Sequence, residues 1–183
     1  MNWFKKILTS NANDDSHKAI SSQELGEQLF NLCHKHTMSF LDSLNDPLQQ
    51  KTVKVNREEI NQVELLIAFM WLYYDLLQGE KYDKALTQMH TCFMNDMTIK
   101  CGLPEDEIWH LLQMRYDEYR QFHRSQDAID FTYQKAAQEI CKNILGLDRQ
   151  NANLDLWVLV AINLQQCILK YGKAIKSIPL KDG

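Results

Sequence analysis

Glycine and proline are scarce in this chain, whose 183 residues include six glycines and three prolines. β-Sandwiches and β-barrels need many tight turns, which these two residues commonly supply, so their scarcity argues against both folds. The chain also lacks a GxSxG element, a P-loop and a GxGxxG run. These absences remove the usual sequence signatures of serine hydrolases and of nucleotide-binding enzymes.

Paired cysteine motifs are absent as well. The chain has an odd number of cysteines and no CxxC, so neither a disulfide framework nor a zinc site of the usual spacing is predicted. Most of the cysteines fall at apolar positions of helical patterns, where cysteine behaves as a small hydrophobic residue. This usage is typical of a reducing cytoplasm. The five are Cys33, Cys92, Cys101, Cys141 and Cys167.

Long hydrophobic runs and strong net charge are also missing. The longest apolar run, from Leu65 to Tyr74, is about half of the roughly 20 residues that a membrane-spanning helix needs. The N-terminal residues carry two lysines but no apolar segment of the kind found in secretion signals. A net charge of −4 gives no case for nucleic-acid binding. We therefore expect a cytoplasmic protein without stable membrane anchoring.

Helical periodicity dominates what is present. Apolar residues recur at three- and four-residue spacing, and capping residues, glycines and prolines mark the ends of each segment. The pattern predicts an all-α, single-domain bundle over residues 21–183, with mostly antiparallel neighbours, behind an N-terminal arm and polar linker at 1–20. Residues 48–55 are expected to be a connection. The predicted helices cover about 21–44, 56–79, 82–101, 104–124, 128–145 and 154–176.

The stretch "LLIAFMWLYYDLL", Leu65 to Leu77, predicts the central helix of the bundle because it is apolar almost all round. At about 100° per residue, one stripe of this helix carries its polar residues, and we expect that stripe to face water. Trp71 lies on it, so we interpret Trp71 as a candidate anchor for a binding partner. Cover from a neighbouring helix or from the N-terminal arm is the alternative. The stripe comprises Glu64, Ala68, Trp71, Asp75 and Gln78.

Three more residues are candidates for contact with a partner. Arg115 falls in the apolar stripe of the 104–124 helix. Its stem can extend to water, it can pair with a buried carboxylate, or it can bind an anion. Trp3 and Phe4, beside two lysines, form a short amphipathic segment that can dock at an interface. Packing of this segment against the bundle, or disorder, is the alternative.

No catalytic, cofactor-binding or metal-ligating residue is predicted. Glu107 and His110 form an E-x-x-H, but di-metal bundles need two such motifs, and here it is predicted to be a solvated first turn. His34 and His36 diverge by about 160° on a helix and cannot chelate one ion. His36 lies in an apolar stripe and is predicted to be a hydrogen-bonded core residue.

These observations favour a small helical protein that acts through protein contacts, as an adaptor, a chaperone-like protein or a self-assembling bundle, and not through catalysis. Its expected partner is another protein or a second copy of the chain. A bundle that binds a small molecule or lipid is the first alternative, because aromatic residues and methionines gather in and near the central helix. A carboxylate–histidine metalloprotein is the second alternative.

Overall fold

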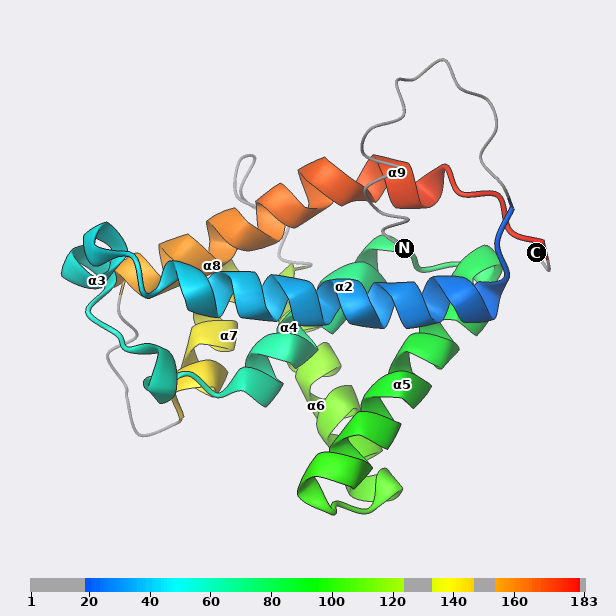
Figure 1. The fold of residues 1–183 in the computed structure, drawn as a ribbon, viewed down its shortest axis with the longest axis horizontal. Coiled ribbons are helices and arrows are strands. Elements are labelled where there is room, and N and C mark those ends of the chain that lie inside the picture. Colours follow the sequence, from blue (N-terminus) through cyan, green and yellow to red (C-terminus); the bar gives the residue numbers. More distant parts are fainter. Residues whose placement is uncertain (1–18, 124–132, 147–153, 182–183) are drawn as a thin grey trace.

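The computed structural model describes residues 19–123, 133–146 and 154–181, and in this part of the chain it is an all-α bundle, as predicted (Figure 1). Residues 1–18, with Trp3 and Phe4, lie outside the described residues. No β-strand occurs in the described ranges; a single bridge pairs Ile20 with Leu180. The α-helices are α2 (Ser22–Ser43), α3 (Pro47–Val53), α4 (Gln62–Leu76), α5 (Asp83–Cys101), α6 (Glu105–His123), α7 (Gln134–Leu145), α8 (Leu154–Cys167) and α9 (Lys173–Lys176).

Side-chain caps set the starts of the first long helices. The hydroxyl of Ser21 accepts a hydrogen bond from the backbone N–H of Glu24 at 3.0 Å, which starts α2 where the sequence predicts it. The predicted start of the central helix at Asn56 was wrong. Asn56 and Glu59 do form a capping box, but it encloses one 3₁₀ turn, Arg57–Glu59. Helix α4 begins after Asn61, whose side chain accepts hydrogen bonds from the first turn.

The connection predicted at 48–55 contains a short helix, α3. The Asp46 carboxylate caps it by accepting from the Leu48 N–H at 2.8 Å, and Pro47 occupies its first position, where a missing N–H costs no hydrogen bond. The "NDP" sequence therefore separates two helices, as predicted, but it also starts the second one. Helix α3 ends at Val53, and the next residue, Lys54, adopts a left-handed conformation with φ of 52°.

The last predicted helix is continuous but not uniform. Helix α8 runs into a π-helical segment, Ile168–Gly172, which leads into α9. An extra residue in such a turn rotates the side chains that follow it relative to those before it. Helix α7 is described only from Gln134, so the predicted residues 128–132 lie outside the described part of the chain.

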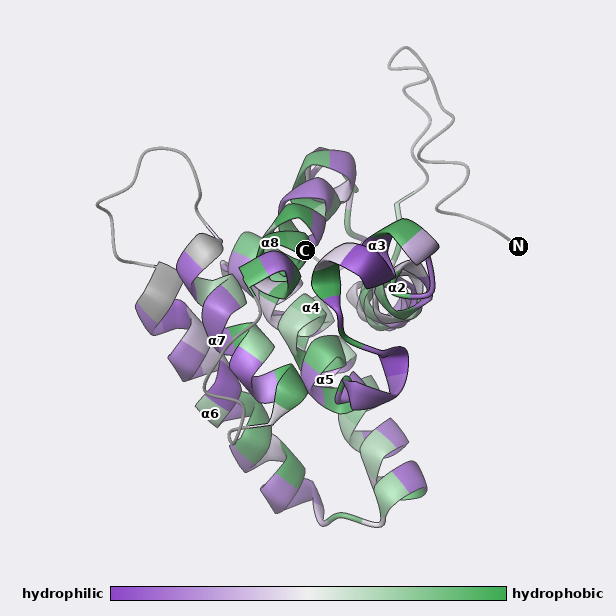
Figure 2. Ribbon diagram, turned by 90° about the vertical axis from the view of Figure 1, so that its left-hand side faces the viewer, coloured by the Kyte–Doolittle hydropathy of each residue, from purple (hydrophilic) through white to green (hydrophobic). Residues whose placement is uncertain are grey.

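Helix α4 occupies the centre of the bundle, and Figure 2 shows the other helices around it. Every residue of α4 from Leu65 to Tyr73 is buried. Helix α2 packs against α4 and α5, and α7 packs against α8 and α6. Gly26 permits the close approach of α2 to α5, because a Cβ atom there would lie 2.4 Å from the backbone oxygen of Ala85. Figure 1 shows α5 and α6 extending away from the rest of the bundle to the loop that joins them.

Candidate functional site

Trp71 lies in the core and not on a water-facing stripe. Its side chain has no exposed surface, and its indole contacts the rings of Tyr119 on α6, at 5.5 Å, and of Tyr133, at 6.2 Å. Glu64 and Ala68, on the same stripe, are also buried. The predicted orientation was wrong for these three residues, because α6 and α7 pack on this side of α4, whereas Gln78 at the end of the stripe is exposed as predicted. Trp71 is therefore covered by its own chain.

Arg115 pairs with a carboxylate in the same region, which is one of the alternatives that the sequence left open. Its Nε donates to Glu64 Oε2 at 2.8 Å and its Nη2 to Glu64 Oε1 at 2.7 Å, a bidentate arrangement. Its Nη1 donates to Glu118 at 3.1 Å, and Asn143 of α7 donates to Glu118 and to Tyr119. The Glu64 carboxylate raises the pKa of Arg115. We call these five residues the closed network, because the chain itself supplies the partners of Arg115.

Two histidine predictions can be compared with the structure. His36 is hydrogen-bonded, as predicted, since its Nε2 lies 2.8 Å from the Tyr73 hydroxyl, but its side chain is half-buried and is not part of the buried core. Burial, with the nearby charges of Lys35 and Lys170, lowers the pKa of His36 to about 4. Glu107 and His110 are exposed on the early turns of α6. In the described ranges no group of three His, Cys, Asp or Glu residues is arranged to hold a metal ion.

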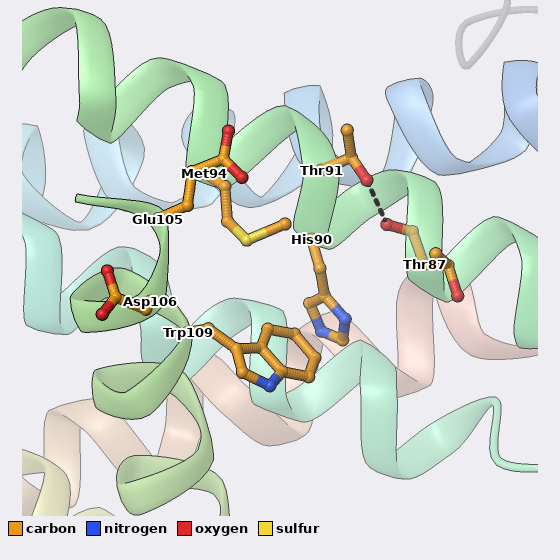
Figure 3. A pocket seen from close by; sticks show the side chains of 7 residues that line it. All are labelled: Thr87, His90, Thr91, Met94, Glu105, Asp106 and Trp109. Atoms are coloured by element: carbon orange, nitrogen blue, oxygen red, sulfur yellow. Dashed lines mark hydrogen bonds between the residues drawn. The ribbon is translucent and has the colours of Figure 1, made fainter.

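A groove lies between α5 and α6, where the two helices leave the body of the bundle. Its volume is about 370 Å³. A second depression of about 270 Å³ adjoins it, shares His90 and Trp109, and extends to Tyr74, Tyr116 and Arg120. We use "the groove" for the larger depression. Figure 3 shows its lining: Thr87, His90, Thr91 and Met94 from α5, and Glu105, Asp106 and Trp109 from α6.

His90 forms the floor of the groove. Its side chain is 6% exposed, and its Nε2 lies 3.0 Å from the Tyr116 hydroxyl. The imidazole meets the Trp109 indole edge-on, with ring centroids 5.7 Å apart, and the Tyr74 ring at 5.8 Å. Burial lowers the pKa of His90 to about 4, so the imidazole is neutral at pH 7. Trp109, in contrast, is 40% exposed and forms one wall.

Helical spacing accounts for this lining on each helix separately. Thr87, His90, Thr91 and Met94 recur at the spacing that shares one face of α5, and Glu105 and Trp109 are four residues apart on α6. Sequence reasoning missed the groove. The α5 pattern was available in the sequence, but a concave site requires two helices to splay apart, and that geometry depends on the packing of α5 on α2 and of α6 on α4 and α7.

Helix α8 presents a second exposed apolar surface. Residues 156–169 contain no charged side chain, although one side of this helix faces solvent. Leu156, Val160 and Leu164 are buried in the core. Four large apolar residues on the other side are exposed, three of them on one face of α8 and the fourth in the π-helical segment that follows; we call these four the α8 face, and the exposed Gln165 and Gln166 lie on the same side of the helix. The four apolar residues are Leu154 (63% exposed), Val158 (39%), Ile162 (44%) and Leu169 (73%).

Comparisons with known proteins identify no relative for these features: no family model, curated protein or solved structure matches the chain. Among the described helices, none combines the length and the apolar character needed to cross a lipid bilayer. The function must therefore be argued from the two surfaces themselves.

Proposed function

We propose that the protein acts through protein–protein contact, and that the α8 face is the contact surface, which pairs with a second copy of the chain. The observation that carries this proposal is the charge-free stretch of α8. Single exposed apolar residues are common on protein surfaces, but contiguous apolar patches usually mark interaction sites. Leu154, Val158 and Ile162 are exposed on one face of α8, and Leu169 is exposed in the π-helical segment that follows.

The shape of the α8 face favours another helix as its occupant. The exposed side of one helix is convex, and a second helix fits it by interdigitating side chains along its length. The residues at the centre, Val158 and Ile162, are β-branched and lose little side-chain entropy when they pack.

The pattern of the α8 face favours a second copy of the same helix, arranged antiparallel. The stripe is nearly symmetric about Ile162, with Leu154 eight residues before it and Leu169 seven residues after it. A two-fold axis at Ile162 would therefore place Ile162 opposite its own copy and Leu154 beside Leu169 of the other copy, with Val158 opposite Gln166. Asp155 precedes the charge-free stretch and Lys170 follows it, so the same axis brings each Asp155 near the Lys170 of the other copy. Antiparallel helix dipoles add to this complementarity.

Sedimentation equilibrium of the full chain tests the proposal. We expect a reversible monomer–dimer equilibrium, because one pair of helices buries less area than a standard permanent interface. Ile162→Lys places two charges at the two-fold axis and is expected to weaken dimerisation by about 100-fold or more. Ile99→Lys is the matched control, since Ile99 is 83% exposed at the far end of α5.

Two outcomes would overturn the proposal. One is a wild-type chain that stays monomeric up to several hundred micromolar, which would leave the N-terminal segment or a different protein as the occupant of the α8 face. The other is a dimer that Ile162→Lys and Ile99→Lys weaken equally. Circular dichroism shows that each variant keeps its helices, so a loss of dimer can be separated from a loss of fold.

A reducing, cytoplasmic setting is part of the proposal. All five cysteines are free thiols in the structure. Burial raises the pKa of the Cys33, Cys141 and Cys167 thiols, which keeps them protonated and slow to react. An adaptor or chaperone-like role toward a different protein stays a prediction.

A further inference from the structure

The imidazole of His90 has hydrogen-bonding capacity that its own chain does not use. Within the described residues, the contact of Nε2 with the Tyr116 hydroxyl is the only hydrogen bond of this ring. The other nitrogen, Nδ1, belongs to a side chain that is 94% buried by neighbouring residues but points into the groove (Figure 3). Nδ1 is not one of the fully buried, unpartnered polar atoms of the described residues, so it is open to the groove and leaves one hydrogen-bonding position there for a ligand.

The two threonines of the groove add acceptors and not donors. Thr91 Oγ1 donates to the backbone oxygen of Thr87 at 3.0 Å (Figure 3), and Thr87 Oγ1 donates to the backbone oxygen of Asp83 at 2.9 Å. Because each hydroxyl proton is engaged within α5, each oxygen offers only its lone pairs to the groove. The polar part of the lining therefore suits a ligand that is rich in donors.

The charges of the groove have one sign. Glu105 and Asp106 belong to the lining, with Asp106 at its edge (Figure 3), and no lysine or arginine belongs to it. A protonated amine is attracted by such a pair and an anion is repelled. The Trp109 indole forms a wall beside them, and an indole face is the aromatic surface that binds cations best. The neutral state of His90 adds no opposing charge.

We infer that the groove between α5 and α6 binds a small primary amine with an apolar or aromatic body. The protonated nitrogen lies near Glu105 and Asp106 against the Trp109 indole, and the body lies along Met94 toward His90. A volume of about 370 Å³ is near the lower end of the range for ligand pockets, so the ligand is a small molecule. This site lies on α5 and α6 and does not depend on the α8 face.

Isothermal titration calorimetry with three probes of the same shape tests the inference. Phenethylamine carries the positive charge, phenethyl alcohol is neutral, and phenylacetate is negative. We expect saturable binding of phenethylamine to the full chain, weaker binding of the alcohol and no binding of phenylacetate. Absence of saturable binding of phenethylamine at millimolar concentration, or equal binding of phenylacetate, would overturn the inference.

Variants of the lining locate the site. Trp109→Ala is expected to weaken phenethylamine binding by about tenfold, and the double variant Glu105→Gln/Asp106→Asn by a similar factor. Glu107→Gln is the matched control, because it removes a carboxylate from the same turn of α6 outside the groove. The control is expected to stay within about twofold of the wild type. An equal loss in the control would show a general charge effect and would overturn the assignment of the site.

A lysine side chain of another protein presents the same ammonium group and is the competing occupant. N-acetyl-lysine methylamide, titrated under the same conditions, reports on it. We expect it to bind more weakly than phenethylamine, because its body cannot stack on the indole and the imidazole together. Tighter binding of the lysine derivative would overturn the small-molecule assignment in favour of a protein ligand.

Discussion

The α8 face and the groove between α5 and α6 are both exposed and both largely apolar, but they differ in shape and in charge. The α8 face is the convex side of one helix, and its stretch 156–169 carries no charge. The groove is concave, has Glu105 and Asp106 in its lining, and has the buried imidazole of His90 as its floor. A convex, charge-free surface suits another helix, whereas a small acidic depression suits a small cation.

The two sides of α6 that face other helices differ: α7 covers one of them, and the groove lies on the other. On the side that faces α7, Arg115 has Glu64 and Glu118 as partners. Asn143 of α7 donates a further hydrogen bond to Glu118, so the polar groups on this side have partners within the chain. On the side that faces α5, the helices splay and His90 keeps one unused nitrogen. Aromatic and polar side chains line both of these sides of α6. Where a helix covers them they form part of the core, and where no helix covers them they line the groove.

The largest expected effect separates a buried tryptophan from an exposed one. Trp71→Ala should lower the free energy of unfolding by about 3–5 kcal/mol, because it leaves a cavity in the core. Trp109→Ala should lower it by about 1 kcal/mol or less, since Trp109 is 40% exposed. Urea unfolding followed by circular dichroism measures both. Equal losses would contradict the contrast between core and groove.

The next effect concerns the closed network. Glu64→Leu should lower the free energy of unfolding by about 3 kcal/mol, because it leaves the Arg115 guanidinium largely buried without its main partner. The double variant Glu64→Leu/Arg115→Met should recover most of that loss, since it replaces an ion pair by apolar packing. Urea unfolding of the wild type, of both variants and of Arg115→Met alone gives the four free energies of a double-mutant cycle. An additive double variant would show that the two residues are not coupled.

A pH effect of intermediate size belongs to the floor of the groove. The pKa of His90 is about 4 in the folded chain, and that of an unfolded histidine is about 6.5. As the pH falls below about 6.5, the unfolded chain takes up a proton and the folded chain does not, so stability present above that pH is lost. At about pH 5 the loss from His90 is about 2 kcal/mol. Urea unfolding above pH 6.5 and at about pH 5 measures this loss of stability. Between the two conditions, His90→Gln should lose about 2 kcal/mol less than the wild type. A pH dependence equal to that of the wild type would contradict the lowered pKa of His90.

The smallest expected effects test whether the two surfaces are independent. Ile162→Lys should leave the affinity for phenethylamine within about twofold, and Trp109→Ala should leave the dimer constant within about twofold. The two surfaces lie on different helices with no shared residue, so little coupling is expected. Calorimetry and sedimentation measure the two quantities. A change of about tenfold in the phenethylamine affinity of Ile162→Lys, or in the dimer constant of Trp109→Ala, would show that the two surfaces are coupled.

Sequence patterns predicted the helices well where the signal is local. The Ser21 cap and the Gly102 end of α5 depend on neighbouring residues, and both lie where the patterns predict them. The hydrogen bond of His36 was also predicted from its place in an apolar stripe, although the residue is half-buried and not core. Asn56 shows the limit of local signals: its capping box is present, but it caps a 3₁₀ turn and not α4.

Tertiary packing produced what the sequence could not predict. A helical wheel shows that Trp71 and Glu64 share a direction, but it does not show that α6 and α7 cover that direction. The partner of Arg115 was equally hidden, because 51 residues separate it from Glu64. The groove at His90 requires two helices to diverge, and no single-helix pattern contains that information.

A charge-swap series in sedimentation equilibrium tests the central claim, antiparallel pairing of α8 with a second copy, most directly. Asp155→Lys alone and Lys170→Asp alone each place like charges near each other across the two-fold axis, and each should weaken the dimer by about three- to tenfold. The double variant restores opposite charges in the swapped order, and we predict that its dimer constant returns to within about twofold of the wild type. A double variant that is as weak as the product of the two single effects would contradict the antiparallel α8 dimer.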